Sequence, residues 1–306
     1  MDSSSKTPLV TIGIPTYNRA KGNLLKVIER SLAQTYENVE VVVSDNCSTD
    51  RTAELVQAID DPRLCYIRQE TNIGPTNNFN FCLETARGEY FLLFHDDDMI
   101  DEDFVESCMA AIEPGRTVGT IHTGVRVIDE HDHVIHENRN KAAGSSMADF
   151  IRGWYRGVTA LYLCNTLYNT AGLREAGGFV SRKNLFNDLI ATITVGARYG
   201  RADVADIKAS FRRHSDNRGS KVPLSDWIDD WQQLLDLTCE LFPDECPELR
   251  KEGQKFFTKK MYRHSAHSPS RVQRLKDYLH SYRTFDYSIS PLRYFYFRKS
   301  RHRPGL

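Results

Sequence analysis

Residues 90–98 read Tyr90-Phe91-Leu92-Leu93-Phe94-His95-Asp96-Asp97-Asp98, an apolar run that ends in three consecutive carboxylates. The short run of aromatic and aliphatic residues predicts a buried strand. Three like charges repel one another unless a cation or strong donors neutralise them. In extended backbone Asp96 and Asp98 point to the same side, and two such carboxylates suit Mg²⁺ or Mn²⁺. The run equally fits the solvated acidic start of a helix, because Asp-Glu-Asp follows at 101–103.

The chain before this run alternates between two hydrophobic periods. Strand patterns lie at 10–14, 40–44 and 64–67, and helical patterns lie between them at 24–32, 53–56 and 76–86. This alternation predicts an α/β fold with a parallel, Rossmann-like sheet and right-handed crossovers. Ligands of such sheets bind at the carboxyl ends of the strands. The residues that follow each strand are therefore the candidate site.

Polar residues follow every one of these strands. Asp45 could accept a proton from a base edge such as a pyrimidine N3–H, while a metal held by the acidic run would bridge a diphosphate. Asp45 could equally form a turn or cap a helix, and Thr16 and Asn18 are ordinary turn residues. The chain has neither a GxGxxG after its first strand nor a Walker A loop, which argues against a dinucleotide site.

The second half is less regular. We expect strands at 118–128 and 133–136, as a hairpin, then a loop at 138–146. Helices are predicted at 187–199, from a Ser225 cap to 242, near 247–264 and at 269–282. The prediction divides the chain into a catalytic domain, 1–220, with halves at 8–115 and 116–220, and a helical basic extension, 221–306.

Composition excludes several classes of protein. Of 306 residues, 40% are hydrophobic and 26% charged, as in ordinary globular enzymes. No apolar run approaches the length of a transmembrane helix, and residues 1–6 lack a signal core. The net charge of −1 argues against binding nucleic acid through bulk charge. Seven cysteines without a CxxC pair predict reduced thiols in a cytoplasmic protein.

The charge is unevenly distributed. Residues 250–306 carry 15 Lys/Arg and 3 Asp/Glu, a balance of +12, so the rest of the chain carries −13. Within this tail, residues 293–303 interleave aromatic rings with cations. That pattern suits peripheral contact with an anionic membrane, at its inner face. The alternative is that the aromatic rings pack back onto the catalytic domain.

Collinear motifs over residues 8–220 resemble the family 2 glycosyltransferases, whose fold is GT-A. Residues 10–19 are similar to the family's opening strand and nucleotide loop, and 44–50 to its second motif, whose first Asp reads the base. The segment Asn72-Ile73-Gly74 precedes Asp96-Asp97-Asp98, which aligns with the family's DxD. The resemblance implies that the donor nucleotide is bound by Pro15, Thr16, Tyr17, Asn18, Asp45, Arg68, Asn72, Gly74, Asp96 and Asp97.

The same resemblance implies a metal site and a base. Asp96 would lie near the donor ribose and, together with Asp98, would coordinate the divalent metal, Mn²⁺ or Mg²⁺. His214 would complete the metal shell, although a surface or structural histidine remains the alternative. Asn187-Asp188 falls where the family usually has Glu-Asp, so Asp188 is the implied general base.

The expected activity is inverting, metal-dependent transfer of one sugar from a nucleoside diphosphate, most simply a UDP-sugar, to a glycan, lipid-linked or small-molecule acceptor. A sugar nucleotidyltransferase would need a Gly-rich loop after the first strand, where only Arg19 and Lys21 are available. A non-catalytic scaffold that binds nucleotide sugars is the other alternative, and the intact Asp96, Asp98 and Asp188 argue against it.

Overall fold

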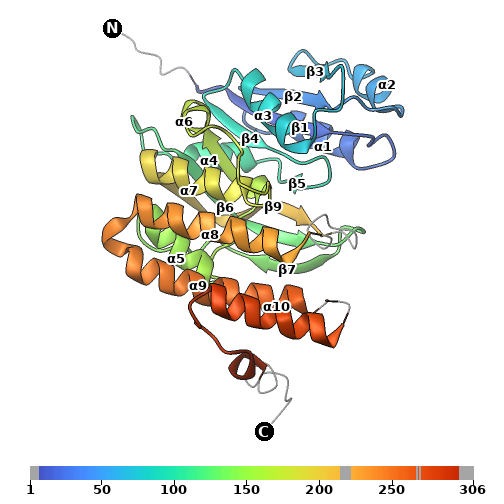
Figure 1. The fold of residues 1–306 in the computed structure, drawn as a ribbon. Helices are drawn as coiled ribbons and strands as arrows, with labels where there is room; N and C mark the ends of the chain where they lie inside the picture. The colour runs from blue at the N-terminus through green and yellow to red at the C-terminus, as the bar shows by residue number, and fades with distance from the viewer. Residues whose placement is uncertain (1–6, 214–221, 267, 269, 296–306) are drawn as a thin grey trace. The chain divides into compact units, whose positions relative to one another are not determined.

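The computed structural model describes residues 7–213, 222–266, 268 and 270–295. Its contacts divide the chain into two compact units. Unit 1 comprises residues 1–180 and 187–215, and unit 2 comprises 181–186 and 216–306. The chain therefore passes from one unit to the other three times. Figure 1 shows the elements of both units along the chain.

Unit 1 is built on a nine-stranded sheet in the order β3-β2-β1-β4-β8-β6-β9-β5, with β7 paired to β6. The first four strands run parallel, as the sequence predicts. They are β1 (Val10–Thr16), β2 (Val39–Asp45), β3 (Leu64–Arg68) and β4 (Tyr90–Leu93). The crossovers between them carry α1 (Leu24–Leu32), α2 (Thr52–Gln57) and α3 (Pro75–Thr85).

The second half of the sheet mixes strand directions. β8 (Thr166–Asn169) runs antiparallel to β4 and to β6 (Thr120–Ile128). β6 pairs in parallel with β9 (Arg201–Arg212), and β9 pairs with the short β5 (Met99–Ile100). The expected hairpin is confirmed, because β7 (Val134–Asn138) lies antiparallel to β6. The helices of this half are α4 (Phe104–Ala110), α5 (Met147–Arg156), α6 (Thr170–Glu175) and α7 (Asn187–Tyr199).

Both faces of the central strands are buried, which explains why these strands read as continuous apolar runs. Ile12 and Leu92 are neighbours in the register and point into the core under α1 and α4. Phe91 and Leu93 point to the other face, into the core under α3, α6 and α7. The sheet therefore holds its strand ends in fixed positions, and the candidate site lies there.

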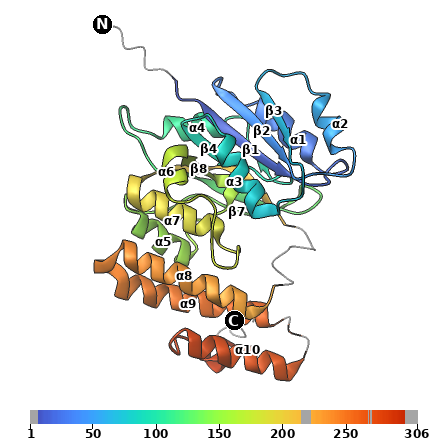
Figure 2. The ribbon, with the colours of Figure 1, turned by 45° about the horizontal axis from the view of Figure 1, so that its top comes forward.

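Unit 2 contains three packed helices, α8 (Leu224–Leu241), α9 (Cys246–Ser265) and α10 (Arg271–Thr284) (Figure 2). The Trp231 ring of α8 lies 3.7 Å, between centroids, from the Phe257 ring of α9. The expected cap of α8 was wrong: Ser225 lies inside the first turn, and the extended Pro223 is the N-cap. Among the helices that the structure describes, none is long and apolar enough to cross a bilayer.

The prediction of seven reduced thiols is also wrong. Cys239 and Cys246 form a disulfide, because the turn at Pro243–Glu245 folds the end of α8 against the start of α9. Their Cα atoms are 4.5 Å apart. The sequence shows no such pairing, since a spacing of seven residues matches no common cysteine motif.

A buried carboxylate organises the short segment 181–186, which unit 2 contains. Asp230 of α8 accepts hydrogen bonds from the Ser181 hydroxyl at 2.7 Å, the Lys183 amide at 2.7 Å and the Leu185 amide at 2.9 Å. Four hydrogen-bonding positions on one carboxylate can satisfy several donors at once. Asp230 therefore fixes the conformation of the segment that directly precedes α7.

Candidate active site

The ends of β1 and β4 meet at Asp96. The Thr16 hydroxyl donates to Asp96 Oδ2 at 2.7 Å, and Arg19 Nε lies 3.2 Å from Asp96 Oδ1. Burial raises the pKa of Asp96 to about 6, while the Arg19 guanidinium and the Thr16 hydrogen bond oppose that rise. Asp96, which is predicted to lie near the donor ribose, therefore contacts the predicted nucleotide loop.

Asp45 lies at the end of β2, fully buried. Its Oδ1 accepts from the Ser48 amide at 2.9 Å, and its Oδ2 accepts from the Tyr66 hydroxyl at 2.6 Å. Arg68 Nε is 3.9 Å from Oδ2. The carboxylate therefore shapes its own turn, and the contact with a base stays a prediction.

Tyr66 is a candidate site residue that the sequence analysis missed. It lies two residues before Arg68 in β3, and residues at that spacing share one face of a strand. Burial is the main cause that raises the pKa of its hydroxyl, followed by the hydrogen bond to Asp45. The hydroxyl therefore remains a donor, and this period-two spacing with Arg68 was the available signal.

Two asparagines join neighbouring loops. Asn18 has a φ of 54°, and its Oδ1 accepts from the Thr49 amide at 2.8 Å, which ties the loop after β1 to the loop after β2. Asn72 Oδ1 accepts from Asn46 Nδ2 at 3.0 Å and from the Gly74 amide at 2.9 Å.

The other predicted nucleotide residues lie nearby in the chain. Pro15 is buried in β1, whereas Tyr17 is exposed just after it. Gly74 precedes α3 with a φ of 83°, a value that side chains disfavour and glycine adopts readily. The structure therefore gathers the predicted residues of β1, β2 and β3 into connected loops at one edge of the sheet.

A possible metal-binding group follows β4. His95, Asp97 and Asp98 offer ligand atoms that all lie within 4.8 Å of one another. Asp98 is buried, and its Oδ1 accepts from the Arg212 amide at 2.9 Å. Burial, together with the charge of Asp97, raises the pKa of Asp98 well above its usual value. Two carboxylates and an imidazole fit a divalent ion, whose charge would favour the ionised carboxylates and the neutral imidazole.

His95 is the ligand candidate that the sequence analysis missed. Burial lowers the pKa of its imidazole, which favours the neutral form that binds metals. Its Nε2 is buried and meets no hydrogen-bond partner among the residues that the structure describes. The available signal was its position between an apolar strand and three carboxylates.

The predicted ligands are distributed differently from this group. Asp98 belongs to it, whereas Asp96 contacts Thr16 and Arg19. His214 lies outside the described residues. The assignment of all three as ligands stays a prediction.

Asp188 lies in the first turn of α7, partly exposed. Its Oδ1 accepts from the Leu189 amide at 2.8 Å, and burial raises the pKa of its carboxyl to about 6. The preceding Asn187 donates from Nδ2 to the Thr76 hydroxyl of α3 at 3.3 Å. The start of α7 is thus tied to the helix that follows the Asn72–Gly74 loop.

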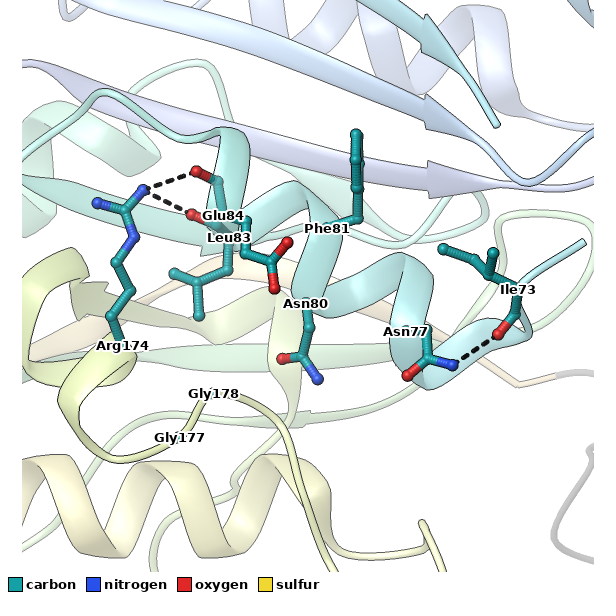
Figure 3. A pocket seen from close by; sticks show the side chains of 9 residues that line it. All are labelled: Ile73, Asn77, Asn80, Phe81, Leu83, Glu84, Arg174, Gly177 and Gly178. Atoms are coloured by element: carbon teal, nitrogen blue, oxygen red, sulfur yellow. Dashed lines mark hydrogen bonds between the residues drawn. The ribbon is translucent and has the colours of Figure 1, made fainter. Parts of the chain in front are cut away.

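A pocket of about 480 Å³ runs along α3 and the Gly177-Gly178 turn (Figure 3). The Asn80 side chain holds that turn through two hydrogen bonds: it accepts from the Phe179 amide at 2.8 Å and donates to the Phe179 carbonyl at 3.1 Å. None of the predicted site residues that the structure describes lines this pocket. Its lining consists of Ile73, Asn77, Asn80, Phe81, Leu83, Glu84, Arg174, Gly177 and Gly178.

The profile of the family described as "Glycosyl transferase family 2" matches residues 11–183, more than half of the chain. The chain belongs to this family. It is therefore a glycosyltransferase, as the motifs predicted. The matched region contains the strand ends, the acidic run and the Gly177-Gly178 turn, and it ends just before α7.

Solved structures establish the fold of this family 2 glycosyltransferase. The chain superposes on S. aureus TarS, residues 1–349, in complex with UDP-GlcNAc, with a TM-score of 0.70 and 19% sequence identity. The superposition covers 92% of this chain and 81% of that TarS 1–349 chain. The predicted GT-A fold with C-terminal helices is confirmed.

Two curated relatives match part of the chain. ExoO of Rhizobium meliloti, a succinoglycan biosynthesis protein, is 41% identical over 98 residues, which are 32% of this chain and 28% of ExoO. WfaP of Escherichia coli, a UDP-Glc:α-D-GlcNAc-diphosphoundecaprenol β-1,3-glucosyltransferase, is 34% identical over 90 residues, 29% of this chain and 36% of WfaP. The matched part is thus about a third of each relative.

Proposed function

We propose that the chain transfers one sugar from a UDP-sugar to an acceptor hydroxyl, with inversion and with the help of a divalent metal. One observation carries the proposal: Asp96 and the His95, Asp97 and Asp98 group follow the same strand, beside the loops that hold Asp45 and Asn18. A diphosphate donor needs this combination of a polar nucleotide cradle and a cation site.

The donor class is supported by likeness and by chemistry. TarS was solved with UDP-GlcNAc, and the name of WfaP specifies UDP-Glc. In this chain Asp45 offers a carboxylate acceptor, which suits the N3–H of uracil. Arg68 and the Tyr66 hydroxyl hold that carboxylate in place at the end of β2.

The residues at the end of β4 would hold the metal, with Asp98 and the neighbouring Asp97 and His95 as ligands and His214 as a further candidate. A bound divalent ion supplies positive charge that stabilises the departing nucleoside diphosphate. Arg19, now paired with Asp96, is a second cation close to the same strand end.

Asp188 acts as the general base in this proposal. Its carboxylate accepts the proton of the acceptor hydroxyl while that oxygen attacks C1 on the face opposite the nucleotide. A pKa near 6 makes the group a better base than an ordinary Asp, and it remains ionised at neutral pH.

The acceptor belongs to glycan or glycoconjugate synthesis in this proposal. ExoO acts in succinoglycan biosynthesis, and the name of WfaP specifies a diphosphoundecaprenol-linked acceptor. We place the chain in the cytoplasm, in peripheral contact with the inner face of a membrane. The balance of +12 over residues 250–306 supports that contact.

Thermal denaturation with nucleotides tests the donor and the metal together. UDP with Mn²⁺ should stabilise the chain, by about 2.7 kcal/mol at a hundredfold excess over Kd, whereas UDP without metal should stabilise it less. Asp98→Ala should abolish the Mn²⁺-dependent part and the turnover of UDP-glucose and UDP-GlcNAc. Full turnover by Asp98→Ala in a chelator would exclude the metal from the mechanism. Stabilisation by GDP and not by UDP would exclude UDP as the donor nucleotide. Binding without any donor turnover in the wild type would favour the scaffold.

A further inference from the structure

Helix α10 presents an apolar stripe to solvent. Val272, Leu275 and Leu279 are 65%, 57% and 41% exposed. Their spacing of three and four residues places them on one side of the helix. Tyr278 is buried instead, and its ring packs edge-to-face on the Tyr262 ring of α9 at 5.2 Å. The packing of α10 on α9 therefore leaves the stripe uncovered by the residues that the structure describes.

Three exposed cations flank the stripe, Arg271, Lys276 and Arg283. Within the described part of the chain, none of them forms an ion pair. Asp277 is the sole acid in the sequence of α10, and its oxygens accept from Ser268 Oγ at 2.5 Å and Gln273 Nε2 at 2.8 Å. We call this surface the α10 outer face; it consists of Arg271, Val272, Leu275, Lys276, Leu279 and Arg283.

We propose that the α10 outer face docks on an anionic phospholipid surface. Its three apolar side chains would enter the boundary between headgroups and acyl chains, and its cations would contact the lipid phosphates. Just after the helix, Tyr287 and Leu292 are also exposed, at 62% and 86%. The inference deepens the membrane contact of the proposed function and rests on that part of it.

Charge selects the bilayer over other occupants. A second copy of the chain, docked through the same face, would bring three cations against three cations. Residues 296–306 of this chain carry four Lys/Arg and no Asp/Glu, so they too are repelled. An anionic surface instead complements the cations while the apolar stripe leaves water.

Vesicle co-sedimentation of the full chain tests the proposal. The probes are phosphatidylcholine vesicles with and without about 30% phosphatidylglycerol, at about 0.1 M and about 0.5 M salt. Binding should need the anionic lipid and weaken at high salt. R271Q/K276Q/R283Q should lower the partition coefficient about 10²-fold, since each cation near such a surface contributes about fivefold. V272S/L275S/L279S, with every charge retained, should lower it at least about tenfold.

The matched control removes the same charge from α9. Lys251, Lys255 and Lys259 are exposed there, and K251Q/K255Q/K259Q should lower partitioning less than about threefold. Equal losses in the two charge variants would show bulk attraction and overturn the assignment to α10. Salt-insensitive binding to neutral vesicles would also overturn it.

Two further measurements test the remaining alternatives. If size-exclusion chromatography shows that the wild type is a dimer and V272S/L275S/L279S is a monomer, a second copy of the chain covers the α10 outer face. That result would overturn the proposal. If the triple variant unfolds at a lower temperature, Leu275→Ser alone decides, and it should still weaken partitioning. Co-sedimentation needs neither donor nor acceptor, so its failure leaves the proposed sugar transfer standing, and an inactive chain that binds vesicles leaves the docking standing.

Discussion

At the scale of single residues, Asp188 is the most direct test of the chemistry. Asp188→Asn keeps the shape of the side chain and removes the base, so kcat should fall about 10²–10⁴-fold. UDP affinity should stay unchanged, and so should stability, because Asn also suits the first residues of a helix. Steady-state kinetics with a defined acceptor and UDP binding by calorimetry measure both. Normal turnover would return Asp188 to a structural role at the start of α7.

The pKa of Asp188 adds a pH dependence to the same test. The base acts in its ionised form, and burial raises its pKa from the usual 3.8 to about 6. The kcat of the wild type should therefore fall about tenfold per pH unit below that value and level off above it. The residual activity of Asp188→Asn should lack this acid limb.

In our proposal Asp45 links the nucleotide loop to the nucleobase of the donor. Asp45→Ala should weaken UDP binding by about 1–3 kcal/mol, because a charge-assisted hydrogen bond is lost. Tyr66→Phe is the control: it removes the hydroxyl that donates to Asp45 and leaves the carboxylate, so the Kd for UDP should change by much less. Calorimetry distinguishes the two, and an unchanged Kd for Asp45→Ala would leave Asp45 a turn former.

At the scale of elements, the Gly177-Gly178 turn can be tested with a paired control. Both glycines have positive φ, 87° and 74°. A Cβ on Gly177 meets nothing within 4 Å, whereas a Cβ on Gly178 would lie 2.4 Å from Asn80 Oδ1. Gly177→Ala should cost about 1 kcal/mol of stability through backbone strain alone. Gly178→Ala should lower the free energy of unfolding, measured by chemical denaturation, clearly more. Equal losses in the two variants would show that the Asn80 side chain moves aside at little cost.

The sequence predicted the elements whose pattern is long and regular. The apolar runs of β1, β2 and β4 are buried on both faces, so their composition alone marks them. β5 has two residues and β8 has four, too few to show a period, and their partners are distant in the chain. Long-range pairing of this kind depends on tertiary packing that no local pattern reveals.

The candidate site was predictable in its positions and less so in its contacts. The polar residues after each strand do converge, because parallel strands end at one edge of the sheet. That Asp96 would contact Arg19, while His95 lies beside Asp98, depends on side-chain directions after β4, where the regular alternation of the strand has ended. Sequence spacing therefore named the region and missed His95 and Tyr66.

At the scale of the whole molecule, the segment held by Asp230 makes this enzyme hard to divide. Because residues 181–186 belong to unit 2 and lie in the chain between the two parts of unit 1, a single cut cannot separate the two units. A fragment that stops before α8 would leave the amides of Lys183 and Leu185 without their acceptor, just ahead of Asp188. The same constraint applies to evolution and to engineering. A new C-terminal module can replace α8–α10 only if it supplies a carboxylate that accepts the hydrogen bonds of this segment.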